Sequence, residues 1–168
     1  FLDLREFFKY KTSEYAIILW IFFFLAYELI FLFLLKRYIR NRISINDHVK
    51  LIHTIIEIIF PGILMFMLTI IEERAVYLDA PYFLTYFLLI AISSLQLNFR
   101  ISFFLGVVAA LQYSALTYYI YNYIIPAQDI KEHMPVASYY VRAVMMLFTG
   151  AASGMIASEI NKRVQNSF

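Results

Sequence analysis

Apolar side chains fall into five long stretches of the chain, with short polar connections between them. Each stretch is longer than an ordinary strand and lacks the period of two of a half-buried strand, so the pattern predicts helices. A helix of about 20 apolar residues crosses roughly 30 Å of hydrocarbon. Short connections make consecutive helices antiparallel neighbours, so we predict an all-α, polytopic transmembrane helical bundle over residues 15–160. The five predicted spans are residues 15–38, 49–71, 81–97, 101–125 and 136–160.

The composition agrees with a membrane domain. Hydrophobic residues make up 62% of the 168 residues and charged residues 15%, which is more apolar surface than a soluble domain of this size could bury. A chain of this length has room for about five or six spans and none for a separate soluble domain. Cysteine is absent, which excludes disulfides and thiolate metal sites.

Basic residues gather on one side of the predicted bundle. Lys36, Arg37, Arg40, Arg42, Lys50, Arg100, Lys162 and Arg163 share this side with the acidic residues Asp47 and Glu159. The other side carries Glu72, Glu73, Asp79, Asp129 and Glu132, with Arg74, Lys131 and Arg142. Cytoplasmic connections are rich in lysine and arginine, so we expect the carboxyl terminus in the cytoplasm, with residues 161–168 starting a cytoplasmic transducer helix.

The first 14 residues mix apolar side chains, such as Leu4 and Phe7, with charged ones, such as Arg5. This pattern predicts a short amphipathic helix that lies in the membrane interface over residues 1–14. With five spans and a cytoplasmic carboxyl terminus, Phe1 lies outside. Either the protein begins there, or a further span precedes it.

Glu28, His53 and Glu57 are ionisable residues that lie well inside the predicted spans, where such groups are costly and are functional candidates. Glu28 and Glu57 lie at similar depth in antiparallel helices, and His53 is one helical turn from Glu57. A carboxylate and an imidazole at this spacing could hold a proton or a metal ion; the alternative is that Glu57 orders the bundle through a polar partner, with Glu28, His53 or Arg100 as candidates. Two ligands without a third convergent group do not make a metal site, so we predict none.

Tyrosines are frequent near the outer surface, as in the aromatic belt of a membrane boundary. Arg142 lies one to two turns inside the last span, close to Tyr139 and Tyr140. Together with Tyr113 these residues form a candidate outer pocket for an anionic head group. The alternative is that Arg142 extends to the interface.

The last span carries small residues on one stripe. Gly150 and Gly154 form a GxxxG pair that Ser158 extends, and such a stripe lets two helices approach closely. We predict that it contributes to a homodimer contact, the alternative being packing inside one bundle.

A series of motifs runs through residues 53–116 in a set order. They are Glu57 with Phe60-Pro61, Tyr86-Phe87-Leu88-Leu89-Ile90, Ser93-Ser94-Leu95, Phe99-Arg100, and Gly106 with Ala109-Ala110 and Tyr113. In order and spacing this stretch resembles the membrane anchor of bacterial class III adenylyl cyclases, although the family pattern has six helices. The resemblance implies an anchor in the bacterial inner membrane. In that family the anchor leads through a helical transducer into a cytoplasmic domain that forms cyclic AMP from ATP at a dimer interface, and the resemblance implies such a domain here, with Mg²⁺ or Mn²⁺.

The residues present carry no such catalytic apparatus, because the aspartates Asp3, Asp47, Asp79 and Asp129 are scattered. We therefore expect a non-catalytic membrane domain without a cofactor or a nucleic-acid partner. It anchors and dimerises a cyclase in the lipid bilayer and relays a signal, such as the binding of a small or lipophilic ligand. One alternative is a small-solute transporter or substrate-binding membrane subunit that uses Glu28, His53 and Glu57, although neither inverted repeats nor broken helices are evident. Another is a passive anchor.

Overall fold

The chain is all-helical in the computed structural model, which describes residues 4–41, 47–72, 75–79, 82–96, 98–124 and 135–166. These ranges hold five α-helices and no strand. The α-helices are α1 (Leu4–Arg40), α2 (Asp47–Glu72), α3 (Tyr82–Ser93), α4 (Phe99–Tyr119) and α5 (Val136–Asn166). Short segments add the 3-10 helices η1 (Ala75–Leu78) and η2 (Ser94–Gln96) and the π-helix η3 (Ile120–Ile124), which continues α4.

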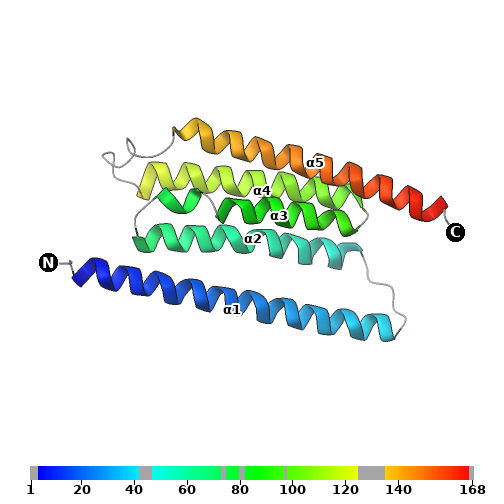
Figure 1. Cartoon of the computed structure of the whole chain (residues 1–168), viewed down its shortest axis with the longest axis horizontal. Coiled ribbons are helices and arrows are strands. Elements are labelled where there is room, and N and C mark those ends of the chain that lie inside the picture. The colour runs from blue at the N-terminus through cyan, green and yellow to red at the C-terminus, as the bar shows by residue number, and fades with distance from the viewer. Residues whose placement is uncertain are drawn as a thin grey trace.

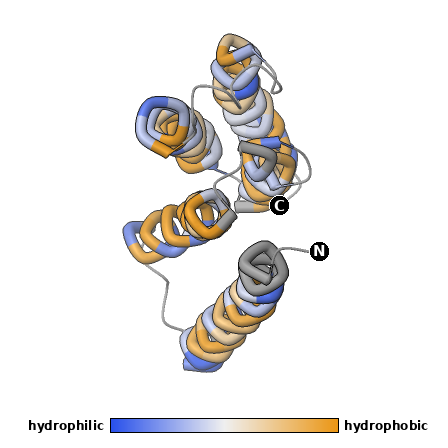
Figure 2. The backbone as a smooth tube through the Cα atoms, turned by 90° about the vertical axis from the view of Figure 1, so that its left-hand side faces the viewer, coloured by the Kyte–Doolittle hydropathy of each residue, from blue (hydrophilic) through white to orange (hydrophobic). Residues whose placement is uncertain are grey.

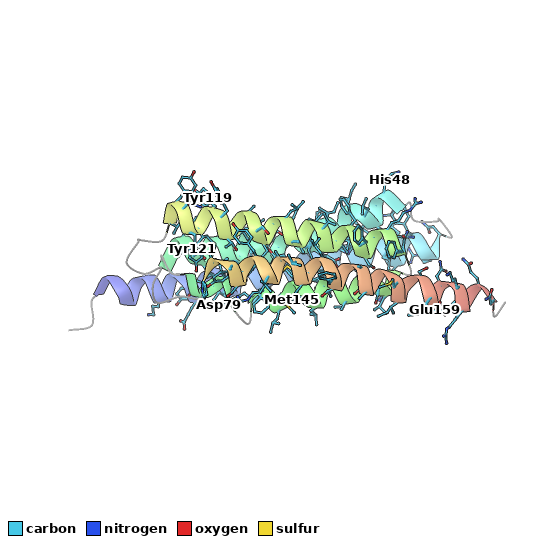
Figure 3. All side chains as sticks on the ribbon, turned by 90° about the horizontal axis from the view of Figure 1, so that it is seen from above. His48, Asp79, Tyr119, Tyr121, Met145 and Glu159 are labelled. Carbon is cyan, nitrogen blue, oxygen red and sulfur yellow. The ribbon has the colours of Figure 1, made fainter. Side chains whose placement is uncertain are left out.

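The five α-helices lie along one common direction, and consecutive helices run in opposite directions (Figure 1). The most extensive packing joins α4 to α5, whereas α1 lies at the edge of the bundle beside α2. The ends of α1 and α5 therefore share one end of the bundle with the starts of α2 and α4. Figure 3 shows this polarity, with His48 and Glu159 toward one end and Asp79 and Tyr119 toward the other.

Four helices in the described part of the chain are long and apolar enough to cross a membrane: α1, α2, α4 with η3, and α5. The protein is thus a membrane protein. The fifth predicted span, residues 81–97, corresponds to α3, which has only 12 residues. It is shorter than its apolar stretch because the hydroxyls of Ser93 and Ser94 donate to the carbonyl oxygens of Ile90 and Ala91, and the chain then tightens into η2.

The amino-terminal region does not confirm the separate interfacial helix predicted over residues 1–14. α1 is one helix of 37 residues that continues without a break through residue 14 into the apolar stretch. No glycine or proline lies within residues 4–40 to interrupt it.

The contact between α4 and α5 depends on two glycines. A Cβ placed on Gly106 would lie 2.8 Å from the Cα of Gly150, and the reverse distance is also 2.8 Å. One turn farther along α5, a Cβ on Gly154 would lie 2.8 Å from Cδ2 of Phe99. The predicted stripe of small residues therefore packs inside one chain, with Gly150 and Gly154 buried and Ser158 half-buried. In this arrangement the two glycines have no free surface for a second copy.

A proline and a glycine shape the middle of α2. Pro61 has no N–H to donate to the preceding turn. The side chain of Gln112 on α4 donates from Nε2 to the carbonyl oxygen of Ile59 at 3.1 Å. Gly62 leaves the necessary space, since a Cβ there would overlap the Gln112 amide. This polar bond fixes the register of α2 on α4.

Aromatic rings join α1 to α2. Phe60 on α2 meets Trp20, Phe24 and Tyr27 of α1, at ring centroid distances of 5.1, 4.9 and 5.7 Å. The opposite face of α1 is exposed and apolar, as expected of a surface that contacts lipid; Phe22, for example, is 73% exposed. Figure 2 shows α1 set apart from the other helices with many hydrophobic residues along it.

Candidate functional site

Two adjacent residues of α1 meet two residues of α2 inside the spans. Tyr27 and Glu28 come from α1, and His53 and Glu57 from α2, where a spacing of four residues places both on the same face. We call these four residues the α1/α2 polar cluster. Glu28 was one of the predicted candidate partners of Glu57, and the structure brings a carboxylate oxygen of each within 4.8 Å.

The histidine is the centre of the α1/α2 polar cluster. The Tyr27 hydroxyl lies 2.8 Å from His53 Nδ1, and the other ring nitrogen, Nε2, lies 3.3 Å from Glu57 Oε1. The ring also stacks on Phe31, with centroids 3.4 Å apart. Only 11% of the His53 side chain is exposed. Contacts on both nitrogens and one face therefore fix the orientation of the imidazole.

Glu28 completes the α1/α2 polar cluster. One carboxylate oxygen from each glutamate and one nitrogen of His53 all lie within 4.8 Å of one another. Glu28 Oε1 is shielded from solvent and has no hydrogen-bond partner within the described residues. Two carboxylates this close repel each other strongly in a medium of low dielectric constant. A shared proton or a bound cation between them would remove that repulsion.

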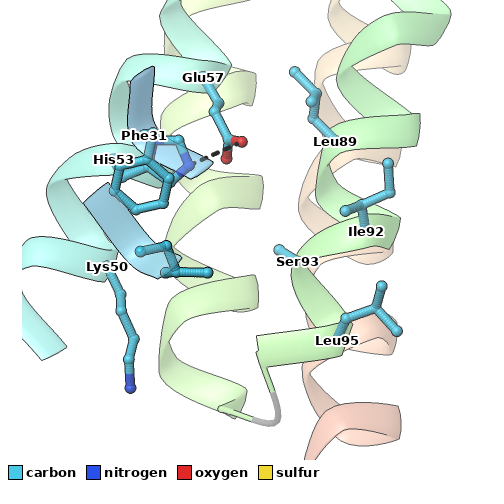
Figure 4. A pocket seen from close by; sticks show the side chains of 9 residues that line it. Phe31, Lys50, His53, Glu57, Leu89, Ile92, Ser93 and Leu95 are labelled. Carbon is cyan, nitrogen blue, oxygen red and sulfur yellow. Dashed lines mark ion pairs between the residues drawn. The ribbon is translucent and has the colours of Figure 1, made fainter. Parts of the chain in front are cut away.

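A cavity of about 350 Å³ opens beside the cluster. His53, Glu57 and Lys50 of α2 face Leu89, Ile92 and Ser93 of α3 across it, and Phe31 and Leu35 of α1 also line it. Figure 4 shows the Glu57 carboxylate directed toward the space between α2 and α3. The cluster therefore has room beside it for water or a small solute.

A second polar group lies near the opposite end of the bundle. Arg142 Nη1 on α5 lies 2.6 Å from Asp79 Oδ1 and donates to the carbonyl oxygen of Leu78 at 3.0 Å. The Tyr113 hydroxyl donates to the same carbonyl oxygen at 2.7 Å, and the Tyr139 hydroxyl to Asp79 Oδ2 at 3.4 Å. This group joins η1 to α4 and α5.

The structure thus brings three of the four outer pocket candidates together, but around an acid of the same chain. The positive charge of Arg142 is offset by Asp79, and its guanidinium carbon lies 4.5 Å from the Phe83 ring centroid. An anionic head group would have to displace Asp79. Tyr140, the fourth candidate, is 39% exposed.

Arg100, a proposed partner of Glu57, lies exposed in the first turn of α4. The partners that the structure gives Glu57 are His53 and Glu28. Tyr27 was not predicted as a site residue, because one tyrosine among 14 carries no distinctive signal. The contacts of Asp79 with Tyr139 and Arg142 were not predicted either, since the sequence shows Asp79 only as one charge of the outer side.

Comparison with known proteins finds no matching family model, no matching curated protein and no matching solved structure.

Proposed function

We propose that this chain is a non-catalytic, signal-relaying membrane anchor that pairs as a homodimer and acts on a cytoplasmic domain through α5. The resemblance of residues 53–116 to class III adenylyl cyclase anchors makes a cyclase, which forms cyclic AMP from ATP, the proposed output domain. The proposed location is a bacterial inner membrane. In this proposal α3, packed between α2, α4 and α5, serves as a fifth, short span.

The length of α5 is the observation that carries the proposal. Its 31 residues extend about 46 Å, well beyond the roughly 30 Å of hydrocarbon. The excess lies at its end, where residues 162–166 are exposed and Arg163 pairs with Glu159 at 3.1 Å. The same helix is packed on α4 through Gly106 and Gly150, so a movement of α4 carries the end of α5 with it.

The charge distribution supports a cytoplasmic end of α5. Lys36, Arg37 and Arg40 end α1, and Lys50 and Arg100 begin α2 and α4 at the same end of the bundle as Lys162 and Arg163. Cytoplasmic ends of membrane proteins are enriched in such residues. We propose the outward face of α5 as the pairing surface, because Val141, Phe148 and Met155 are exposed there at seven-residue spacing.

The proposal is tested by joining the full chain at residue 168 to the catalytic domain of a bacterial class III cyclase. The fusion is expressed in cells that lack cyclase activity. We expect more cyclic AMP than from the same domain without the anchor, because anchoring and pairing raise the local concentration of the catalytic domains. Equal cyclic AMP from both would contradict the proposal.

A second candidate function rests on the α1/α2 polar cluster and the cavity beside it. A membrane subunit that binds or transports a small cation could use Glu28, His53 and Glu57. Proteoliposomes that enclose a zinc-sensitive dye test transport directly. Faster Zn²⁺ entry with the wild type than with Glu57→Gln would favour this candidate over the anchor.

A further inference from the structure

We propose that Glu28, His53 and Glu57 bind one divalent transition-metal ion between α1 and α2. The site does not depend on the proposed function, because an anchor, a sensor or a transporter could contain it.

The ligand atoms stand at distances that suit a metal. Around a tetrahedral zinc ion with bonds of about 2.0 to 2.2 Å, neighbouring ligand atoms lie about 3.3 to 3.5 Å apart. His53 Nε2 and Glu57 Oε1 are 3.3 Å apart. A carboxylate oxygen of Glu28 lies within 4.8 Å of a ring nitrogen of His53 and of a carboxylate oxygen of Glu57, so a small rotation of its side chain brings it into the same coordination sphere. The third convergent ligand, which the sequence alone did not provide, is therefore Glu28.

The orientation of His53 is also that of a metal ligand. Metal-bound histidines usually donate their second ring N–H to a neighbouring acceptor, which fixes the tautomer. Tyr27 provides this acceptor, because its hydroxyl oxygen lies 2.8 Å from Nδ1. With the proton on Nδ1, the lone pair of Nε2 points toward the glutamates. The stacked ring of Phe31 keeps the imidazole in that plane.

A cation would supply a partner for the Glu28 carboxylate oxygen that has no hydrogen bond within the described part of the chain. Glu28 Oε1 is shielded from solvent and, among the described residues, receives no hydrogen bond. A buried carboxylate oxygen without a partner is costly, and a second carboxylate close by adds repulsion. A divalent ion neutralises both carboxylates. The cavity lined by Lys50, His53, Glu57 and Ser93 supplies space for a water molecule at the fourth position.

The ligand set selects the class of ion. Mg²⁺ and Ca²⁺ prefer oxygen ligands alone, whereas an imidazole with two carboxylates suits Zn²⁺, Mn²⁺ and related ions. Of these, Zn²⁺ binds such sites more tightly than Mn²⁺. The described contacts of α1 are made mainly to α2, so a bound ion would also fasten α1 to the rest of the bundle.

The test uses the full chain in detergent, purified with a tag that contains no histidine. Zn²⁺ is titrated in competition with a coloured chelator of known affinity. We expect one ion per chain in the wild type and a loss of more than tenfold in affinity in Glu28→Gln, His53→Gln and Glu57→Gln. His48→Gln, which removes an exposed histidine of the same helix, is the matched control and should bind Zn²⁺ like the wild type.

Tyr27→Phe keeps the ring contacts and removes only the hydroxyl, so it serves even where a ligand variant does not fold. Loss of such a supporting group lowers metal affinity by roughly 10 to 100-fold. Co²⁺ adds a spectroscopic readout, because its visible absorption reports a low coordination number; the band should appear in the wild type and be absent in His53→Gln. Binding of less than one Zn²⁺ per chain, equal affinity in Tyr27→Phe and the wild type, or the same loss in His48→Gln as in His53→Gln would each overturn the proposal.

Discussion

Gly106 of α4 and Gly150 of α5 lie so close that a Cβ on either would stand 2.8 Å from the Cα of the other. The two helices meet backbone to backbone at this point. The carbonyl oxygen of Ser102 also lies 3.1 Å from the Cβ position of Gly150, so an added side chain has no flexible neighbour to displace. The pair therefore sets the distance between the two helices that the proposed relay uses.

Gly150→Ala is expected to destabilise the bundle, because the added methyl group forces α4 and α5 apart. Overpacking of this kind costs about 1 to 3 kcal/mol. Loss of helix content during titration with a denaturing detergent measures the change. Ala152→Val, on the exposed side of α5, is the control and should stay near the wild-type midpoint. Equal midpoints for Gly150→Ala and the wild type would contradict the close packing.

Asp79 and Arg142 are expected to stabilise the protein as a pair. Their side chains are 24% and 14% exposed, so the ion pair is partly shielded from water. A double-mutant cycle with Asp79→Asn and Arg142→Met should give a coupling energy of about 1 to 3 kcal/mol. Additive effects of the two substitutions would show that the 2.6 Å contact contributes no coupling.

The proposed orientation predicts which single cysteines an impermeant maleimide reaches in intact cells. The chain has no cysteine, so the background is clean. Asp129→Cys, which lies outside the described residues, should be labelled, and Asn41→Cys should be labelled only after the cells are opened. The reverse pattern would place the carboxyl terminus outside.

The outward face of α5 is expected to form the homodimer contact. Phe148 is 71% exposed, and under oxidising conditions Phe148→Cys should form a disulfide between two copies in the membrane. Ser153→Cys is a matched control, because Ser153 is only 6% exposed and belongs to the side of α5 that packs within the chain. Dimers from Ser153→Cys and none from Phe148→Cys would show that the outward face of α5 is not the homodimer contact.

Hydropathy predicted most of the helices because burial in lipid demands long apolar stretches. Residues 49–71 correspond closely to α2, and residues 136–160 lie within α5. Hydropathy failed where the apolar stretch is longer than the helix that it forms, as in the short α3, whose end depends on two serine hydroxyls. It also separated residues 1–14 from the first span, because charge pattern does not reveal that a helix continues unbroken.

The candidate site was predictable only where its residues share one helix. The spacing of four residues between His53 and Glu57 places them side by side in any α-helix. Glu28 could be added only as a residue of similar depth, since the rotation of α1 against α2 is set by the rings around Phe60. Asp79 and Arg142 are 63 residues apart, so no local pattern joins them.

The relay through α5 is tested most directly by rotating its end. One to seven alanines are inserted after Lys162 in the fusion with a cyclase catalytic domain, and each alanine turns the following helix by about 100°. The account predicts that cyclic AMP formation falls with two added alanines and recovers with four and with seven, where the helical phase returns close to the original. The same rate for every insertion would contradict the relay and leave a passive anchor.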